Sequence, residues 1–535
     1  MRKPIHGAST PSLIAASGQP LDRRSFIKGA GALGLAAATS SLALPKRARA
    51  QVNGGHLKMG SSQGSTTDST EPGTYENGFP IMLSYNIQGK LTVVGSDNKL
   101  HGDLAESWEP SDGAKKWAFK LRNAVFHNGA PVTSADVIAS LNHHRGDESK
   151  SAAKPVVANI KDIKADGDKG FIVELSSGDA DFPFILTDYQ LAIVKAGPDG
   201  KIAWNDDGNR AGPYRLKEYN PGVRALLEKS DNYWNADVGH FASVEAITIS
   251  DVTARQNALI TGEVDIIDRP DLRTVDMLKA DPNLIVEEAS GFRWHGFTAF
   301  CDTPPFDNND VRLALKYAID RKALLAAALN GHGTIGNDQP ITPSYRYYNA
   351  DLPPFEYDLD KAKFHLKKAG LSKIDIDLSA SPAAFAAAVD CSLLYKSQAA
   401  GAGININVVN EPADGYWSNV WLKKPFIATD WGGRPTEDLM FSVEFKAGAP
   451  WNDTHFNNER FEKLLVEARA ELDEPKRAEM YGEMQKIVRD EGGAIIPIIP
   501  NMNWAYNKKI KHGPSISKTW ELDGWMFISR WWMES

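Results

Sequence analysis

Cysteine is scarce in this sequence: Cys301 and Cys391 are the only two among 535 residues. Iron–sulfur clusters and covalently attached haems need clustered cysteine ligands, so this scarcity argues against both. We therefore expect no cofactor. Two free, buried thiols are expected rather than a disulfide, because both cysteines flank stretches that belong to the same part of the predicted fold.

Long apolar runs and an excess of basic charge are also missing beyond residue 50. No stretch of 18 apolar residues follows Ala50, so we expect a soluble protein without a membrane-spanning helix. The first 50 residues hold eight of the 60 Lys and Arg and one of the 68 Asp and Glu, which leaves 52 basic and 67 acidic residues and a net charge of −15. Nucleic acids and anionic membranes bind clustered basic surfaces, so neither is an expected partner.

The first 50 residues carry the features of an export signal. The sequence DRRSFIK contains a twin-arginine pair (Arg23 and Arg24), a short apolar run follows at 29–38, and ARA at 48–50 matches the pattern that signal peptidase reads. The apolar run is much shorter than the roughly 20 residues that cross a bilayer. We therefore predict a twin-arginine signal peptide over the first 50 residues, and a mature chain that starts near Gln51 in the periplasm.

The sequence GAGALG at 29–34 matches the GxGxxG fingerprint of dinucleotide-binding folds. That motif holds a pyrophosphate only when a strand precedes it and a helix follows it. Here it lies inside the export signal and follows basic and polar residues. We therefore reject it as a nucleotide site.

The remaining 485 residues exceed what one hydrophobic core usually supports, so two or more lobes are expected. Alternating apolar residues and short apolar runs predict strands, and helical periodicity predicts helices. The predicted strands are 56–60, 116–121, 169–175, 214–219, 225–229, 264–267, 374–378, 404–409 and 494–499. The predicted helices are 135–141 with Ser134 as N-cap, 253–261, 311–329, 359–369, 384–400, 458–472 and 476–490. The strand–helix–strand order over 374–409 implies a partly parallel sheet.

Six blocks, in a fixed order, carry a resemblance to a known family. They are LAESWEPSDGAKKWAFKLRNAVFHNGAPVTSADVIASLN (104–142), AGPYRLKEYNPGVRALLEKSDNYW (211–234), NALITGEVDII (257–267), PPFDNNDVRLALKYAIDR (304–321), YDLDKAKFHLKKAGL (357–371) and FEKLLVEARAELDEPKRAEMYGEMQKIVRDEGGAIIPI (461–498). Together they resemble extracellular solute-binding protein family 5, the dipeptide-, oligopeptide-, nickel- and opine-binding receptors of ABC importers.

The resemblance implies an α/β, two-lobed periplasmic binding protein of type II, with an extra subdomain in lobe one and two crossover strands between the lobes. Carried over, lobe one is 51–300 plus 501–535, its extra subdomain is about 84–204, and lobe two is 301–500. The ligand lies between the lobes, and closure buries it. Ligand contacts on both lobes would favour the closed state.

One loop of lobe two is the first candidate for contact with the ligand. Dipeptide and oligopeptide receptors place an aspartate there for the ligand's ammonium group, whereas ATDWGGRPTED (428–438) places Arg434 near that position. A guanidinium suits a carboxylate or phosphate, which it binds through two parallel N–H bonds. Asp430 and Glu437 are the acids that remain for an amine, and a surface turn is the alternative for the whole loop.

Further candidates come from aromatic and polar side chains that the resemblance puts near the cleft. Trp417 and Trp431 could stack on a ligand or cover a cation, although tryptophan is also an ordinary core residue. Trp294 and His295 precede the first crossover, and strand alternation allows only one of them to face inward. In the first-strand loop, Ser62 and Gln63 are possible hydrogen-bond donors.

Two motifs suggest other chemistry and are rejected. The adjacent histidines His143 and His144 point to different faces of a helix, so they rarely share one metal ion, and a helix C-terminus favours cationic residues. GSSQG at 60–64 matches the GxSxG nucleophile elbow, but a polar loop follows it in place of the required helix. We expect no catalytic residue and no metal ligand.

These features predict a monomeric periplasmic receptor rather than an enzyme. It would capture a small-molecule solute, such as a peptide, an opine or a modified amino acid that carries an anionic group, and deliver it to an inner-membrane ABC permease. A receptor for a metal chelate of the nickel type and a periplasmic hydrolase are the alternatives. The sequence does not reveal the ligand.

Overall fold

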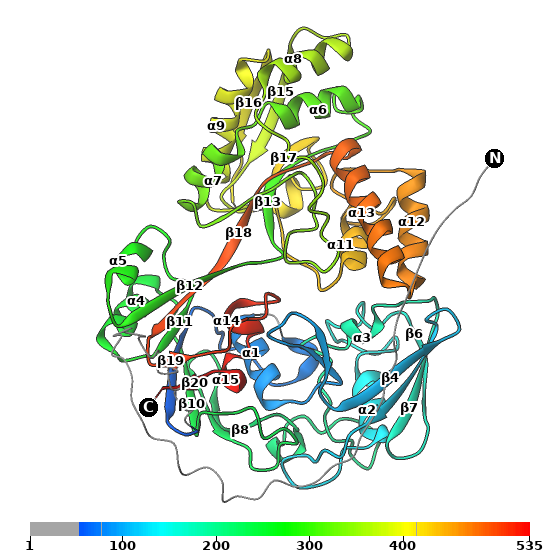
Figure 1. Cartoon of the computed structure of the whole chain (residues 1–535), viewed down its shortest axis with the longest axis vertical. Coiled ribbons are helices and arrows are strands. Elements are labelled where there is room, and N and C mark those ends of the chain that lie inside the picture. Colours follow the sequence, from blue (N-terminus) through cyan, green and yellow to red (C-terminus); the bar gives the residue numbers. More distant parts are fainter. Residues whose placement is uncertain (1–52, 76, 414, 535) are drawn as a thin grey trace, which may run out of the picture. The chain divides into compact units, whose positions relative to one another are not determined.

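The structure is a computed structural model that describes residues 53–75, 77–413 and 415–534. The predicted signal peptide lies outside the described residues. No helix among the described residues is long and apolar enough to cross a membrane. All described residues belong to one unit, Ala50–Ser535, which holds two lobes (Figure 1).

The main sheet has twelve strands. Ten follow the order β16-β15-β17-β13-β18-β11-β1-β10-β9-β8, and β12 and β14 pair with β18 beside this path. We call the part with β1 and β8 to β12 the first lobe, and the part with β13 to β17 the second lobe. The strands are β1 His56–Ser61, β8 Tyr214–Asn220, β9 Arg224–Lys229, β10 Ser243–Thr248, β11 Ile266–Asp268, β12 Leu284–Ser290, β13 Trp294–Ala299, β14 Gly333–Ile335, β15 Ile374–Ala380, β16 Ile404–Asn410, β17 Phe426–Trp431 and β18 Ala494–Asn507.

Strand β18 belongs to both lobes. Its first half pairs with β13 and β14, and its second half pairs with β11 and β12. The strand β12 also leads into β13 through only three residues, so the chain crosses between the lobes twice (Figure 1). The sequence predicts only the apolar stretch 494–499 as a strand. The strand continues to Asn507 because the first-lobe strands pair with its more polar second half.

An antiparallel sheet of four strands, in the order β4-β5-β7-β6, extends the first lobe. Its apolar side chains alternate with exposed ones, as in β5, and form a separate buried cluster. We call this sheet with its helices the extra subdomain. Its strands are β4 Ala105–Ser111, β5 Lys116–Leu121, β6 Ile160–Ala165 and β7 Gly170–Leu175, and the pair β2 Thr92–Val94 and β3 Leu100–Gly102 precedes them. The residue boundaries of the lobes and of the extra subdomain stay predictions.

Helices cover these sheets. In the first lobe and the extra subdomain they are η1 Pro72–Thr74, α1 Gly78–Ile87, α2 Ser134–His143, α3 Phe182–Ile185, η2 Asp207–Asn209, α4 Val252–Thr261 and α5 Val275–Ala280. In the second lobe they are α6 Asn309–Tyr317, α7 Arg321–Leu329, α8 Leu359–Lys368, α9 Ala388–Ala400, α10 Tyr416–Asn419, α11 Glu437–Glu444, α12 Glu459–Ala470 and α13 Glu474–Glu491. The C-terminal tail folds back onto the first lobe as β19 Ile510–Lys511, α14 Glu521–Gly524, α15 Phe527–Arg530 and β20 Trp532–Met533.

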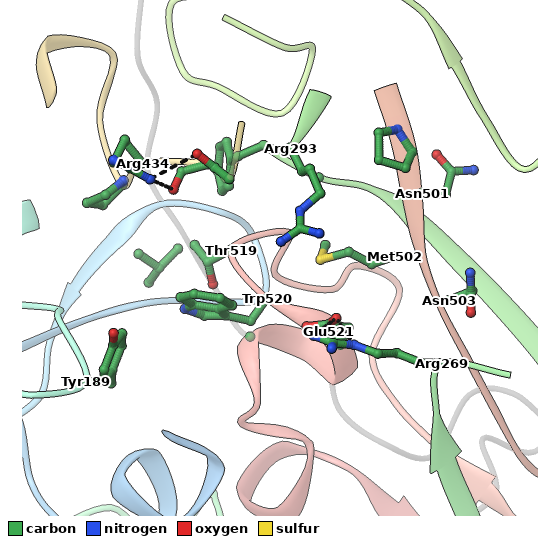
Figure 2. A pocket seen from close by; sticks show the side chains of 18 of the residues that line it. Tyr189, Arg269, Arg293, Arg434, Asn501, Met502, Asn503, Thr519, Trp520 and Glu521 are labelled. Atoms are coloured by element: carbon green, nitrogen blue, oxygen red, sulfur yellow. Dashed lines mark hydrogen bonds and ion pairs between the residues drawn. The ribbon is translucent and has the colours of Figure 1, made fainter. Parts of the chain in front are cut away.

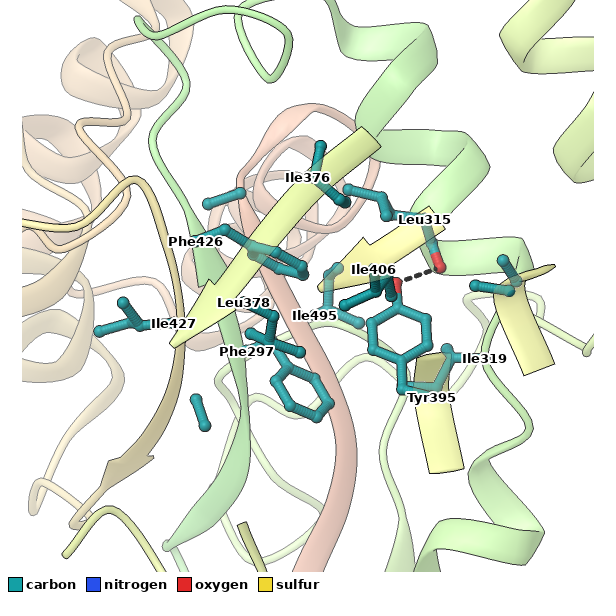
Figure 3. Close-up of a cluster of buried hydrophobic side chains, with 14 of the residues drawn as sticks. Phe297, Leu315, Ile319, Ile376, Leu378, Tyr395, Ile406, Phe426, Ile427 and Ile495 are labelled. Carbon is teal, nitrogen blue, oxygen red and sulfur yellow. Dashed lines mark hydrogen bonds between the residues drawn. The ribbon is translucent and has the colours of Figure 1, made fainter. Parts of the chain in front are cut away.

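The second lobe is built on the predicted βαβ unit. Strands β15 and β16 pair in parallel, and helix α9 connects them. Side chains from the sheet and its helices interlock in one buried cluster, in which the Tyr395 hydroxyl donates to the Leu315 carbonyl oxygen at 2.8 Å (Figure 3). Cys391 is buried in this cluster and Cys301 is half-buried, and both are free thiols.

The predicted helix 311–329 is wrong, because the structure has two helices there, α6 and α7. The Asp320 side chain accepts hydrogen bonds from the backbone N–H groups of Lys322 and Ala323, so it caps a second helix inside the apolar pattern. Another cap also differs from the prediction. Thr133, not Ser134, is the N-cap of α2, where it forms a capping box with Asp136.

Candidate functional site

A cavity of about 570 Å³ lies between the two lobes, beside both crossovers. Its first-lobe wall includes Tyr85, Val94, Phe184, Thr187, Asp188, Tyr189, Arg269, Pro270, Leu272, Thr519, Trp520, Glu521, Gly524 and Met526. The crossovers and the second lobe add Gly291, Phe292, Arg293, His295, Gly432, Gly433, Arg434, Pro435, Pro500, Asn501, Met502 and Asn503. Its volume is in the range of small-molecule sites.

The loop after β17 holds Arg434 against the cavity. Gly433 lies so close to Phe292 that an added Cβ would be 2.1 Å from the phenylalanine Cβ, so only glycine fits there. The Arg434 guanidinium donates to the carbonyl oxygens of Gly432 at 3.0 Å and Gly433 at 3.2 Å, and its backbone N–H donates to the Tyr345 hydroxyl at 3.0 Å. Hydrogen bonds within the loop thus hold the Arg434 side chain in one direction.

Arg434 keeps a positive charge that no carboxylate among the described residues neutralises through an ion pair. Its guanidinium lies 5.6 Å from the centre of the Trp431 ring and 5.8 Å from that of Trp451, which are cation–π contacts. The acid whose charge acts on it is Glu444, which is fully buried. Burial, together with the charge of Asp453, raises the pKa of Glu444 well above its usual range.

Two other arginines at the cavity have acidic partners. The Arg269 guanidinium donates to Glu521 Oε1 at 2.7 Å. Arg293 extends into the space between the two walls, and its guanidinium lies 3.7 Å from Asp430 Oδ2 (Figure 2). The positive charge without a carboxylate partner is therefore at Arg434.

Asp430 is bound by groups of the protein itself. His295 Nδ1 lies 2.9 Å from Asp430 Oδ1, and Arg293 approaches the other carboxylate oxygen. The imidazole of His295 also stacks on Phe385, with ring centres 4.7 Å apart. These contacts leave Asp430 less able to attract the ammonium group of a solute.

The opposite wall is aromatic. Tyr189 and Trp520 meet edge to face at 6.0 Å, and both lie across the cavity from Arg434 (Figure 2). Asp188 lies beside them, and burial raises its pKa to about 6. Lys90, which is buried and whose charge acts on Asp188, has its pKa lowered by burial to about 7. With a pKa of about 6, Asp188 is still mostly ionised at neutral pH.

The structure brings two of the predicted ligand residues, Arg434 and His295, to the cavity wall. Asp430 and Trp431 lie directly behind them: Asp430 contacts His295, and Trp431 packs under Arg434 while its indole N–H donates to Asp453 at 3.0 Å. Trp294, the neighbour of His295, is fully buried in the second-lobe core, as strand alternation requires.

The other predicted residues have partners away from the cavity lining. Ser62 donates its backbone N–H and its hydroxyl to Asp268. Gln63 accepts a hydrogen bond from the first N–H of helix α1, at Gly78. Trp417 is 42% exposed and meets Trp421 edge to face at 5.8 Å. A role of these residues in ligand binding stays a prediction.

Sequence reasoning missed most of the cavity wall. Arg293 could have been predicted from the sequence, because it precedes the predicted pair Trp294 and His295 in the same crossover. Tyr189 and Trp520 have no motif around them, and only the fold brings the extra subdomain and the C-terminal tail to the same wall.

With this geometry established, comparison with known proteins identifies the family. Residues 99–453 match the model of the bacterial extracellular solute-binding proteins, family 5, and the chain belongs to this family. Residues 20–40 match the signal sequence of the twin-arginine translocation pathway, so the N-terminus is a twin-arginine signal for export to the periplasm.

Individual relatives are distant but extend over most of the chain. A dipeptide-binding protein of Escherichia coli K12 is 26% identical over 520 residues, which cover 87% of this chain and 92% of that protein. The solved structure of the binding protein AgaA from A. tumefaciens R10, in complex with agropinic acid, has a TM-score of 0.69 and 24% identity over 90% of this chain and 99% of its own. HbpA2 from Haemophilus parasuis has a TM-score of 0.79 and 20% identity over 88% of this chain and 99% of its own. These relatives confirm the predicted two-lobed fold, and the first two are binding proteins.

Proposed function

We propose that the chain is the periplasmic receptor of an ABC importer, and that it captures a small peptide-like or opine-like solute with an anionic group. The position and charge of Arg434 are the observation that supports an anionic ligand. It lines a cavity between two lobes, its own loop fixes its direction, and no ion pair with a described carboxylate neutralises it.

The chemistry of the site favours an anion for a second reason. Burial raises the pKa of Glu444 well above its usual range, which disfavours the charged form of this acid near Arg434. Asp430, the acid near Arg293, already contacts both His295 and Arg293. A carboxylate that enters the cavity can accept two parallel N–H bonds from Arg434 where water is largely excluded, which strengthens them. Tyr189 and Trp520, on the first lobe, would then cover the rest of the solute.

Calorimetric titration tests the proposal. Small molecules that copurify with the protein are identified by mass spectrometry, and opines and di- to tetrapeptides are added to the set. Each carboxylate compound is compared with its carboxamide analogue. We expect a bound carboxylate compound to lose affinity when its carboxylate is amidated. Equal affinities for the two forms would contradict an anion site.

A receptor for a metal chelate is the second candidate, and His295 is the observation that favours it. A carboxylate that contacts one nitrogen of an imidazole is a common arrangement around histidines that bind metals, and Asp430 makes this contact with His295. Titration with nickel alone and with nickel plus free histidine separates the two candidates. Binding that requires both components and is lost in His295→Ala would favour the chelate.

A further inference from the structure

A second set of charged contacts joins the lobes away from the cavity. Asp181, directly before helix α3 of the extra subdomain, accepts two hydrogen bonds from Arg477 of α13, at 2.8 and 2.6 Å. Arg346 of the second lobe donates to the same carboxylate at 2.6 Å. One aspartate of the first lobe is thus held by two arginines of the second.

The central pair of this ion cluster, Asp181 and Arg477, is buried, and Arg346 is 32% exposed. The Asp181 side chain is 1% exposed and that of Arg477 is 2% exposed. Burial opposes ionisation of Asp181, but the charges and hydrogen bonds of Arg477 and Arg346 outweigh it and lower the pKa of the carboxyl. Burial likewise opposes the charge of Arg477, and Asp181 raises the pKa of the guanidinium above its usual range. All three groups are therefore charged near neutral pH.

Neighbouring contacts strengthen the same junction. The backbone N–H of Ala180 donates to the carbonyl oxygen of Arg469 at 2.8 Å, across the two lobes. The Arg346 guanidinium also lies 4.7 Å from the centre of the Phe184 ring. The segment around α3 is thus attached to the second lobe by a backbone hydrogen bond, an ion cluster and a cation–π contact.

Asp181, Arg346 and Arg477 border the cleft but are not in the wall of the 570 Å³ cavity. Arg346 and Arg477 line a neighbouring cavity of about 820 Å³. The two cavities share Val94, Phe184, Phe292, Pro435 and Thr519 in their walls. The ion cluster is therefore at the far end of one continuous cleft, with the crossovers at the other end.

We propose that Asp181, Arg346 and Arg477 form a latch that holds the two lobes together at the end of the cleft opposite the crossovers. They act as positioning residues, because they set how far the cleft is closed without touching a solute in the 570 Å³ cavity. Without the Asp181 charge, the buried Arg477 would lose its carboxylate partner, and the partly exposed Arg346 would keep only Glu474 at 4.0 Å. Separation of the lobes then rehydrates both guanidinium groups, which favours the open state. The inference rests on the proposed function only in that it concerns the same cleft.

Small-angle X-ray scattering of the purified exported protein, without added solute, tests the latch. We expect Asp181→Asn to increase the radius of gyration and the maximum dimension, while circular dichroism stays that of the wild type. Asp162→Asn is the matched control, because Asp162 is a half-exposed acid of the same subdomain that pairs with the surface residue Lys164 and accepts a hydrogen bond from the backbone N–H of its neighbour Ile163. It should leave the scattering unchanged.

Arg346→Ala is the second variant, because it leaves the Arg477–Asp181 pair in place and removes a side chain that is 32% exposed. It should open the lobes in the same direction but less. If Asp181→Asn does not fold, the scattering of Arg346→Ala tests the latch. Unchanged scattering in the folded variants would overturn the latch. Because no solute is added, this outcome is independent of the proposed function, which fails only if carboxylate solutes do not bind.

Discussion

Arg434 and Arg477 both belong to the second lobe and both face the cleft, but they differ in what holds their charge. Arg477 donates from both terminal guanidinium nitrogens to Asp181 of the first lobe. The guanidinium of Arg434 donates to carbonyl oxygens of its own loop and lies over two tryptophan rings. The difference indicates two roles. We propose that Arg477 holds the two lobes together and that Arg434 is available to an anionic solute.

The largest expected effect is on the free energy of unfolding, and it depends on whether a buried ion pair can become exposed to water. Asp338 pairs with Arg321 inside the second lobe, where both are buried, so Asp338→Ala should lower the free energy of unfolding by about 3–5 kcal/mol. Asp181→Ala should cost less, because separation of the lobes exposes its arginines to solvent. Urea unfolding of both variants measures the difference. A larger loss for Asp181→Ala would mean that the junction cannot open.

The second effect is a pH dependence at the latch. Burial raises the pKa of Asp179 to about 7, and the charges of Asp181 and Asp438 add to the shift. The folded state therefore binds this proton more tightly than the unfolded state, and stability falls as the pH rises from about 4 through 7.

Asp179→Asn should remove this loss, which amounts to up to about 4 kcal/mol. Urea unfolding at about pH 5 and about pH 8 checks it: the wild type should lose more stability between the two than the variant does. Identical pH profiles would show that Asp179 is ionised in the folded protein at both pH values.

The third effect is on affinity. Arg434→Ala should weaken binding of the copurifying solute by about 1.5–3 kcal/mol, since a charge-assisted hydrogen bond is lost. That is roughly a ten- to hundredfold rise in Kd by calorimetry. Arg460→Ala is the control, because Arg460 is half-exposed and pairs with Glu483 on the surface. An unchanged Kd in Arg434→Ala would remove this residue from the site.

The smallest effect concerns what orients Arg434. Trp451 is 47% exposed, and its ring lies near the guanidinium. Trp451→Ala should therefore leave the core intact and remove a cation–π contact of about 0.5–1 kcal/mol, which is a two- to fivefold loss of affinity. A loss as large as that of Arg434→Ala would indicate direct contact between Trp451 and the solute.

Much of the fold could be predicted from the sequence, because strand alternation and helical periodicity are local. The errors have tertiary causes. The predicted helix 311–329 is two helices in the structure. The apolar pattern continues on both sides of Asp320, so the pattern alone does not show that Asp320 caps the second helix, which packs separately from the first. The second half of β18 has more polar residues than a buried strand usually has. Its pairing with β11 and β12 keeps it in the strand conformation.

The candidate site was less predictable. Arg434 could be predicted, because its loop aligns with the loop that binds the ligand in related receptors. Tyr189 and Trp520 could not, because nothing in their local sequence distinguishes them from core aromatics. The latch was also out of reach, since Asp181 and Arg477 are far apart in the chain and each has the appearance of an ordinary surface charge.

Strand β18 limits how the lobes can move. Hydrogen bonds fix its register to strands of the second lobe on one half and of the first lobe on the other. Pro497 and Pro500 lie near the point where it passes from one lobe to the other, and proline has no N–H to add to a ladder. Rotation of the lobes about the crossover strands is therefore the motion that this pairing leaves free, because sliding along β18 would break the register on one half of the strand. The Asp181 junction lies away from these strands, so a small rotation there would separate Asp181 from Arg477 by a large distance.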